Sequence, residues 1–64
     1  MELKKLKPGS FFTLKEMSEP KDSQVYIKGE YDRALKKFFC CNFDDINRIR
    51  HLQGDKIVYT EFTF

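Results

Sequence analysis

The sequence predicts an all-β fold, a small five-stranded antiparallel barrel of the SH3-like type, and three observations lead to this prediction. Residues 24–31 alternate with period two, which places Val25, Ile27 and Tyr31 on one face of a strand. Residues 36–43 are rich in aromatic side chains and apolar on both faces, as expected for a central strand in a sheet that curls on itself. Turn-forming residues separate these and further short segments, which is typical of small barrels.

The first strand is predicted at residues 10–15, directly after a turn signal. Pro8 fixes its own φ angle, and Gly9 accepts the positive φ that tight turns require. In the strand that follows, alternation directs Phe12 toward the core and leaves Phe11 partly exposed.

The remaining elements follow from turn residues and from β-branched or aromatic content. Residues 16–23 are polar, and Pro20 excludes a central strand there, so this segment is predicted to be a long loop. Asp side chains bond nearby backbone donors, which predicts a turn around Asp44 and Asp45. Further strands are predicted at residues 48–52 and 57–64, and further turns at residues 32–35 and 53–56.

The chain has the length of a single domain, residues 1–64, and its aromatic residues are expected to fill the core. A chain this short buries only about 60% of the surface that its unfolded form exposes. Seven Phe and three Tyr compensate for this, because each buried ring removes on the order of 150–250 Å² from water. An OB-like barrel is the alternative architecture, but it generally contains a helix, and no segment has the period of one.

The two cysteines indicate a reducing environment. Cys40 and Cys41 are neighbours on a predicted strand and point to opposite faces, so they are not expected to bridge each other. For the same reason their sulfurs do not converge on one ion with His51, the one histidine, which argues against a metal site. No apolar run has the length of a signal peptide or a membrane span. We therefore expect a cytoplasmic protein without a metal or other cofactor.

The sequence predicts a protein that is not an enzyme. A nucleophilic pair of a cysteine with His51 is a minor alternative, because free cysteine is more often a small buried hydrophobe. The neighbouring carboxylates of Asp44 and Asp45 suit a turn better than acid/base chemistry, since consecutive turn residues seldom converge. Binding is therefore the expected activity.

Basic and aromatic residues provide the candidate binding site. The net charge is only +2, so a nucleic-acid partner requires clustered charges rather than a large total. Phosphates pair with Lys and Arg while bases stack on rings, and exposed rings and open strand edges equally suit a protein partner. Alternation directs Phe11 and Tyr26 outward. The candidate binding residues are Tyr26, Lys28, Arg33, Lys36, Lys37, Arg48, Arg50 and Tyr59.

Residues 25–33, 43–47 and 58–64 resemble short uncharacterised proteins of bacterial phages and mobile elements. The resemblance implies a context, because very small proteins on such elements often inhibit a host defence system, as anti-CRISPR proteins do. The leading hypothesis is therefore an inhibitor that binds a host nucleic-acid-handling protein or ribonucleoprotein through the hairpin at residues 24–43. The alternatives are a single-stranded RNA- or DNA-binding barrel and a protein that homodimerises through a strand edge.

Overall fold

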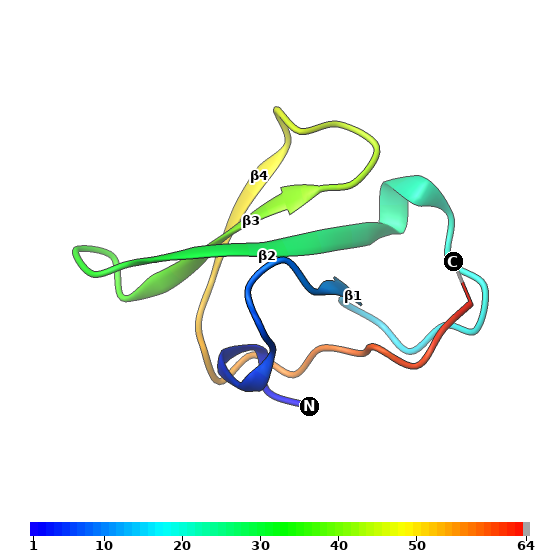
Figure 1. The fold of residues 1–64 in the computed structure, drawn as a ribbon, viewed down its shortest axis with the longest axis horizontal. Coiled ribbons are helices and arrows are strands. Elements are labelled where there is room, and N and C mark those ends of the chain that lie inside the picture. Colours follow the sequence, from blue (N-terminus) through cyan, green and yellow to red (C-terminus); the bar gives the residue numbers. More distant parts are fainter. Residues whose placement is uncertain (64) are drawn as a thin grey trace.

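The computed structural model describes residues 1–63, and its strands form one antiparallel sheet (Figure 1). The strand order in this part of the chain is β1-β2-β3-β4, so β2 and β3 are central and β1 and β4 are edges. The prediction of an all-β fold and the central placement of residues 24–43 are confirmed. The strands are β1 (Phe11–Thr13), β2 (Val25–Asp32), β3 (Lys37–Asn42) and β4 (Ile49–Leu52), accompanied by the short 3-10 helices η1 (Leu3–Lys5) and η2 (Asp22–Gln24).

The sheet is a four-stranded, open one within residues 1–63, and the predicted closing strand is not present in its described part. Residues 57–63 pass η1 and the end of β1 (Figure 1), and two isolated bridges hold them there, Ile57 to Glu2 and Tyr59 to Thr13. The bridge to Thr13 consists of two bonds between backbone N–H and C=O groups, of 2.9 and 3.0 Å.

The shortness of β1 explains this difference from the prediction. β1 ends at Thr13, whose hydroxyl donates a hydrogen bond to the carbonyl of Lys15 at 2.6 Å. A side chain that bonds the local backbone competes with strand pairing, so the C-terminal segment meets only the last residue of a partner strand. Phe64, the last residue of the predicted strand, lies outside the described residues.

A β-bulge in β2 changes which side chains share a face. Lys28 lies opposite Cys40 and Tyr31 lies opposite Phe38, so three steps along β2 match two steps along β3. The extra residue turns Tyr31 to the face of Phe38, where the two ring centroids are 4.9 Å apart. The prediction that Tyr31 shares a face with Ile27 is therefore wrong, because strict alternation does not anticipate a bulge.

Two of the predicted turns are held by aspartate side chains. Asp32 Oδ1 accepts hydrogen bonds from the backbone N–H groups of Ala34 and Leu35, at 2.9 and 3.2 Å. Asp45 Oδ1 accepts one from the N–H of Asn47 at 3.0 Å. Both turns are confirmed, and the bond of Asp45 is the kind of local backbone contact from which the second turn was predicted.

The main buried cluster lies on one side of the sheet, where η1 contributes Leu3 and the C-terminal segment contributes Val58, while Val25 and Thr13 are buried on the other side. Phe12 is fully buried as predicted, and its ring stacks on Tyr26 with 6.0 Å between centroids. The expectation that Tyr26 faces outward is wrong, since it is only 6% exposed. The buried cluster consists of Leu3, Phe12, Tyr26, Cys40 and Val58.

Candidate binding face

The side of the sheet opposite the core carries a continuous apolar row across all four strands. Phe11 pairs with Ile27, Ile27 with Cys41, and Cys41 with Ile49. Directly opposed residues project to the same side, and Cys41 projects away from the core because its neighbour Cys40 is fully buried. Phe11 and Ile49 are each 43% exposed. We call this surface the outer face and include in it Phe11, Ile27, Phe39, Cys41, Ile49 and His51.

A second cross-strand pair extends this surface toward the β2–β3 turn. Phe39 and His51 pair between β3 and β4, and their rings meet edge to face at 5.4 Å between centroids. Glycine is required at position 29, because a Cβ there would collide with the backbone carbonyl of Phe39. A shallow hollow of about 580 Å³ lies beside the ring and is lined by Gly29, Glu30, Tyr31, Asp32, Arg33 and Phe39.

Two phenylalanine rings border the other end of the outer face. Phe43, directly after β3, packs edge to face against Phe11 with 5.6 Å between ring centroids. Its backbone N–H donates to the carbonyl of Val25 at 2.8 Å, which continues the β2–β3 ladder beyond Asn42. The outer face thus has aromatic pairs at both ends of its aliphatic row.

The core side of the same strands holds a buried cation. Lys28 is 4% exposed, and its ammonium donates hydrogen bonds to the carbonyls of Leu6 and Lys4 at 2.5 and 3.4 Å. The ammonium also lies 4.3 Å from the centre of the Phe38 ring, a cation–π contact. These contacts attach the segment that contains η1 to β2, so Lys28 stabilises the fold rather than presenting a charge to a ligand.

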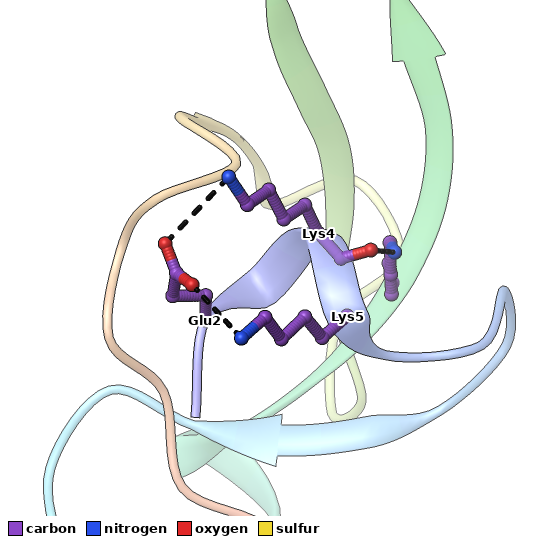
Figure 2. A network of polar contacts seen from close by, with 4 residues as sticks. Glu2, Lys4 and Lys5 are labelled. Atoms are coloured by element: carbon purple, nitrogen blue, oxygen red, sulfur yellow. Dashed lines mark hydrogen bonds and ion pairs between the residues drawn. The ribbon is translucent and has the colours of Figure 1, made fainter.

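Figure 2 shows the η1 end of this arrangement. Glu2 lies between the side chains of Lys4 and Lys5 and forms ion pairs with them at 3.8 and 3.4 Å. All three side chains are at least partly exposed, so each pair contributes little to stability. The backbone carbonyl of Lys4 points away from these pairs toward the ammonium of Lys28.

Burial changes the proton affinity of two core groups. Burial lowers the pKa of Lys28, and the facing Cys40 raises it by a smaller amount. Burial likewise raises the pKa of the Cys40 thiol, against smaller opposing effects of the Gly29 backbone and Lys28. Desolvation disfavours the charged form of both groups. The neutral thiol of Cys40 is therefore a packing element of the core.

The structure does not bring the predicted binding residues together. Tyr26 and Lys28 are buried on the core side, and their contacts are internal. Arg33 and Lys36 are exposed in the β2–β3 turn, where Lys36 has a positive φ of 56°, and the partly buried Lys37 begins β3. These five residues do not form one surface.

The other predicted residues lie away from the β2–β3 turn. Arg48 and Arg50 are exposed at β4, and the Arg50 guanidinium lies 6.0 Å from the Tyr26 ring. Tyr59 is half-buried in the C-terminal segment, where its backbone pairs with Thr13. The basic residues therefore occupy opposite ends of the sheet instead of forming a continuous track.

Among residues 1–63, no group of three His, Cys, Asp or Glu side chains is placed to hold a metal ion. Cys40 and Cys41 are free thiols on opposite faces of β3, as predicted from their adjacency. In the same part of the chain, no helix is long and apolar enough to cross a membrane.

Sequence reasoning emphasised charged residues and missed the outer face. Phe39, His51 and Ile49 were not among the candidate residues, although they form its exposed part beside Cys41. The available signal was the two-sided apolar pattern of residues 36–43, which places apolar side chains on both sides of this strand. Comparison with protein-family models, with curated proteins and with solved structures found no match to the chain.

Proposed function

We propose that the protein is a non-enzymatic binding protein that holds a protein partner on its outer face. The observation that carries this proposal is the apolar row Phe11, Ile27, Cys41 and Ile49, which crosses every strand of the sheet and ends in exposed large side chains. Exposed apolar side chains that gather on one surface, particularly aromatic ones, characterise partner-binding sites.

The placement of charge favours a protein over a nucleic acid. Side chains of Arg50 and Cys40 share the core side because the two residues pair directly, and alternation places Arg48 on that side too. Lys28 is buried in the core. A nucleic acid that stacked on the rings of the outer face would have these cations on the opposite side of the sheet from its phosphates.

The alternative function is single-stranded nucleic-acid binding, and the aromatic pairs Phe39–His51 and Phe11–Phe43 favour it. Their rings flank the aliphatic row, as stacking platforms for bases do. Lys37, which alternation places on the same side of β3 as Phe39, and Arg33, which lines the hollow beside that ring, are sequence-predicted cations available to phosphates. This function ranks second because Ile49 and Ile27 offer bases no stacking surface.

The narrower form of the proposal is a cytoplasmic inhibitor, encoded on a mobile element and similar in role to anti-CRISPR proteins. It acts on a host nucleic-acid-handling protein or ribonucleoprotein. The sequence resemblance to small proteins of phages and mobile elements supports this role, and the two free thiols are compatible with the cytoplasm.

We further infer that the architecture is a partly open SH3-like barrel. The meander of four strands and the pairing of Tyr59 with Thr13 support this inference, because they bring the C-terminal segment beside the first strand. In such a barrel the outer face lies on the convex side, where a partner has free access.

Capture from a host lysate tests the function. The tagged protein is expected to retain a protein partner after nuclease treatment, and the variant Phe39→Ser/Ile49→Ser is expected to lose it. Ile46→Ser is the matched control, because Ile46 is 71% exposed and lies in the turn before β4. Loss of all captured protein on nuclease treatment would support the nucleic-acid alternative instead.

The adjacent cysteines provide a second measurement. Iodoacetamide is expected to alkylate Cys41 on the outer face much faster than the buried Cys40. A bound partner is expected to slow the reaction of Cys41 and leave that of Cys40 unchanged. An undiminished rate at Cys41 in the complex would move the interface away from the outer face.

A further inference from the structure

β4 is an edge strand whose free side carries backbone hydrogen-bonding groups. Within residues 1–63 it pairs with β3 alone, and Ile49, Arg50 and His51 are all exposed. The backbone N–H of Asn42 donates to the carbonyl of Arg48 at 3.0 Å, which makes these two residues a hydrogen-bonded pair. An unpaired row of N–H and C=O groups is a template for another strand.

The pairing pattern identifies the groups on that free side. Hydrogen-bonded and non-hydrogen-bonded pairs alternate along an antiparallel ladder. Arg50, two residues after Arg48, therefore bonds to β3, whereas Ile49 and His51 belong to non-hydrogen-bonded pairs. The N–H and C=O groups of Ile49 and His51 thus point away from β3 toward the open edge.

The two sides of this edge differ in chemical character. Arg48 and Arg50 project to the core side, and the ion pairs within residues 1–63 join Glu2 to Lys4 and Lys5 rather than involving either arginine. Ile49 and His51 project to the outer face. A strand added here meets cations at alternate positions and apolar or aromatic groups at the positions between them.

We propose that the edge of β4 receives an extended segment of a partner protein in which acidic residues alternate with apolar ones. Its acidic side chains pair with Arg48 and Arg50, and its apolar side chains continue the outer face beyond Ile49. This inference rests on the proposed function and names the chemistry of the partner. Charge complementarity selects the sequence of the segment, and backbone bonds to Ile49 and His51 hold it in place.

Other occupants fit the edge less well. Two copies of β4 paired antiparallel place Arg50 against Arg50, or against Arg48 when Ile49 faces Ile49 of the other copy, and like charges directly opposite each other are destabilising. A nucleic acid offers phosphates, which accept hydrogen bonds but do not donate them. The outward carbonyls of Ile49 and His51 would then remain without donors.

A blocked synthetic peptide that alternates glutamate with valine is the probe. Amide hydrogen exchange, followed by NMR, is expected to be fast at Ile49 and His51 in the free protein and slow at Arg50. Saturating peptide is expected to slow exchange at Ile49 and His51 by about tenfold or more, because both amides gain a partner. Exchange at these two amides that does not change in the presence of bound peptide would overturn the proposal.

Charge exchange tests the role of the arginines. The variant Arg48→Glu/Arg50→Glu is expected to bind the glutamate peptide at least about tenfold more weakly than the unchanged protein does. It is expected to bind instead a peptide that alternates lysine with valine. Lys15→Glu/Lys21→Glu is the matched control, since both lysines are exposed in the loop before β2 and should leave affinity unchanged. Equal affinity for a peptide of the same composition with its glutamates grouped at one end would contradict the alternation.

The remaining outcomes separate this inference from the proposed function. Concentration-dependent protection of Ile49 and His51 without peptide would identify a second copy as the occupant, and protection by an oligonucleotide would identify a nucleic acid. Either result overturns the inference. If the peptide does not protect Ile49 and His51 while Phe39→Ser/Ile49→Ser still abolishes partner capture, the outer face binds its partner without strand addition. If capture survives that variant, the proposed function itself fails.

Discussion

The two faces of the sheet differ in a way that hydrophobicity alone does not predict. The core side contains a fully enclosed lysine, Lys28, and at its margin the arginine Arg50. The outer face has no Asp, Glu, Lys or Arg among its members, and yet most of them are exposed: Phe11, Phe39, Ile49 and His51. In this chain, therefore, a cation marks the buried face and apolar side chains mark the accessible one.

The comparison shows that an exposed apolar surface can resemble a core in sequence. A cation is tolerated inside because the carbonyls of Leu6 and Lys4 and the ring of Phe38 satisfy it. An apolar surface outside costs little stability but favours association, which is the physical basis of the binding role proposed for it. Predictions that separate the two faces energetically are the most direct tests.

The largest expected difference is between the aromatic residues of the two faces. Phe12→Ala is expected to lower the free energy of unfolding by about 3–5 kcal/mol, because it empties a fully buried site. Phe39→Ala is expected to lower it by about 1 kcal/mol, since this ring is 36% exposed. Urea denaturation followed by circular dichroism measures both. Equal losses would mean that the outer face is as well packed as the core.

An intermediate effect is expected at the buried cation. Lys28→Met is expected to destabilise the protein by about 1–3 kcal/mol at pH 7, because the carbonyls of Leu6 and Lys4 lose their donor. Lys28→Arg serves as the comparison variant that keeps a cation, although the planar guanidinium is larger than the ammonium that it replaces. Stability unchanged by Lys28→Met would show that these carbonyls need no donor.

The same variant changes the dependence of stability on pH. Burial lowers the pKa of Lys28 below 10.5, so in the pH range just below 10.5 the unfolded chain binds more protons and stability rises with pH. Burial raises the pKa of Cys40 above 9.0, so stability falls as pH rises past 9.0. Lys28→Met is expected to abolish the rise of stability just below pH 10.5 and to keep the fall of stability above pH 9.0. If stability measured by denaturation depends on alkaline pH in the same way for the unchanged protein and for Lys28→Met, Lys28 is not the source of the rise.

The smallest effect is expected in the β2–β3 turn. Lys36→Gly is expected to stabilise the protein by about 0.5 kcal/mol, because a side chain at φ 56° costs energy that glycine avoids. Lys37→Gly, one residue later in the regular strand β3, is the control and should destabilise by about 0.5–1 kcal/mol. A loss of stability in both variants would show that the positive φ of Lys36 carries no energetic cost in this turn.

Local patterns in the sequence were sufficient to predict most of the sheet. Alternation and turn chemistry placed residues 24–31 and 36–43 in its centre, and the predicted turns follow β2 and β3, held by the side chains of Asp32 and Asp45. The bulge before Tyr31 was not predictable, because it depends on how two strands align rather than on either strand alone. The segment at residues 57–63 has strand-like composition but meets only the end of β1.

The binding face was harder to predict than the fold. Period-two alternation states that Tyr26 and Lys28 share a face, which is true, but it does not state which face is buried. Charge suggested that Lys28 was outside, whereas the backbone carbonyls around η1 accept its ammonium. Those acceptors come from a segment more than twenty residues away in sequence, so no local pattern contains them.

The enclosure of Lys28 also gives the protein an internal reporter for chemical footprinting. Amine-reactive reagents reach exposed lysines such as Lys15 and Lys21 in the folded state, but reach Lys28 only when η1 separates from β2. Modification at Lys28, read by mass spectrometry, therefore counts molecules that have opened. A surface variant that loses its partner while Lys28 stays unmodified has lost an interface, and one in which Lys28 reacts has lost its fold.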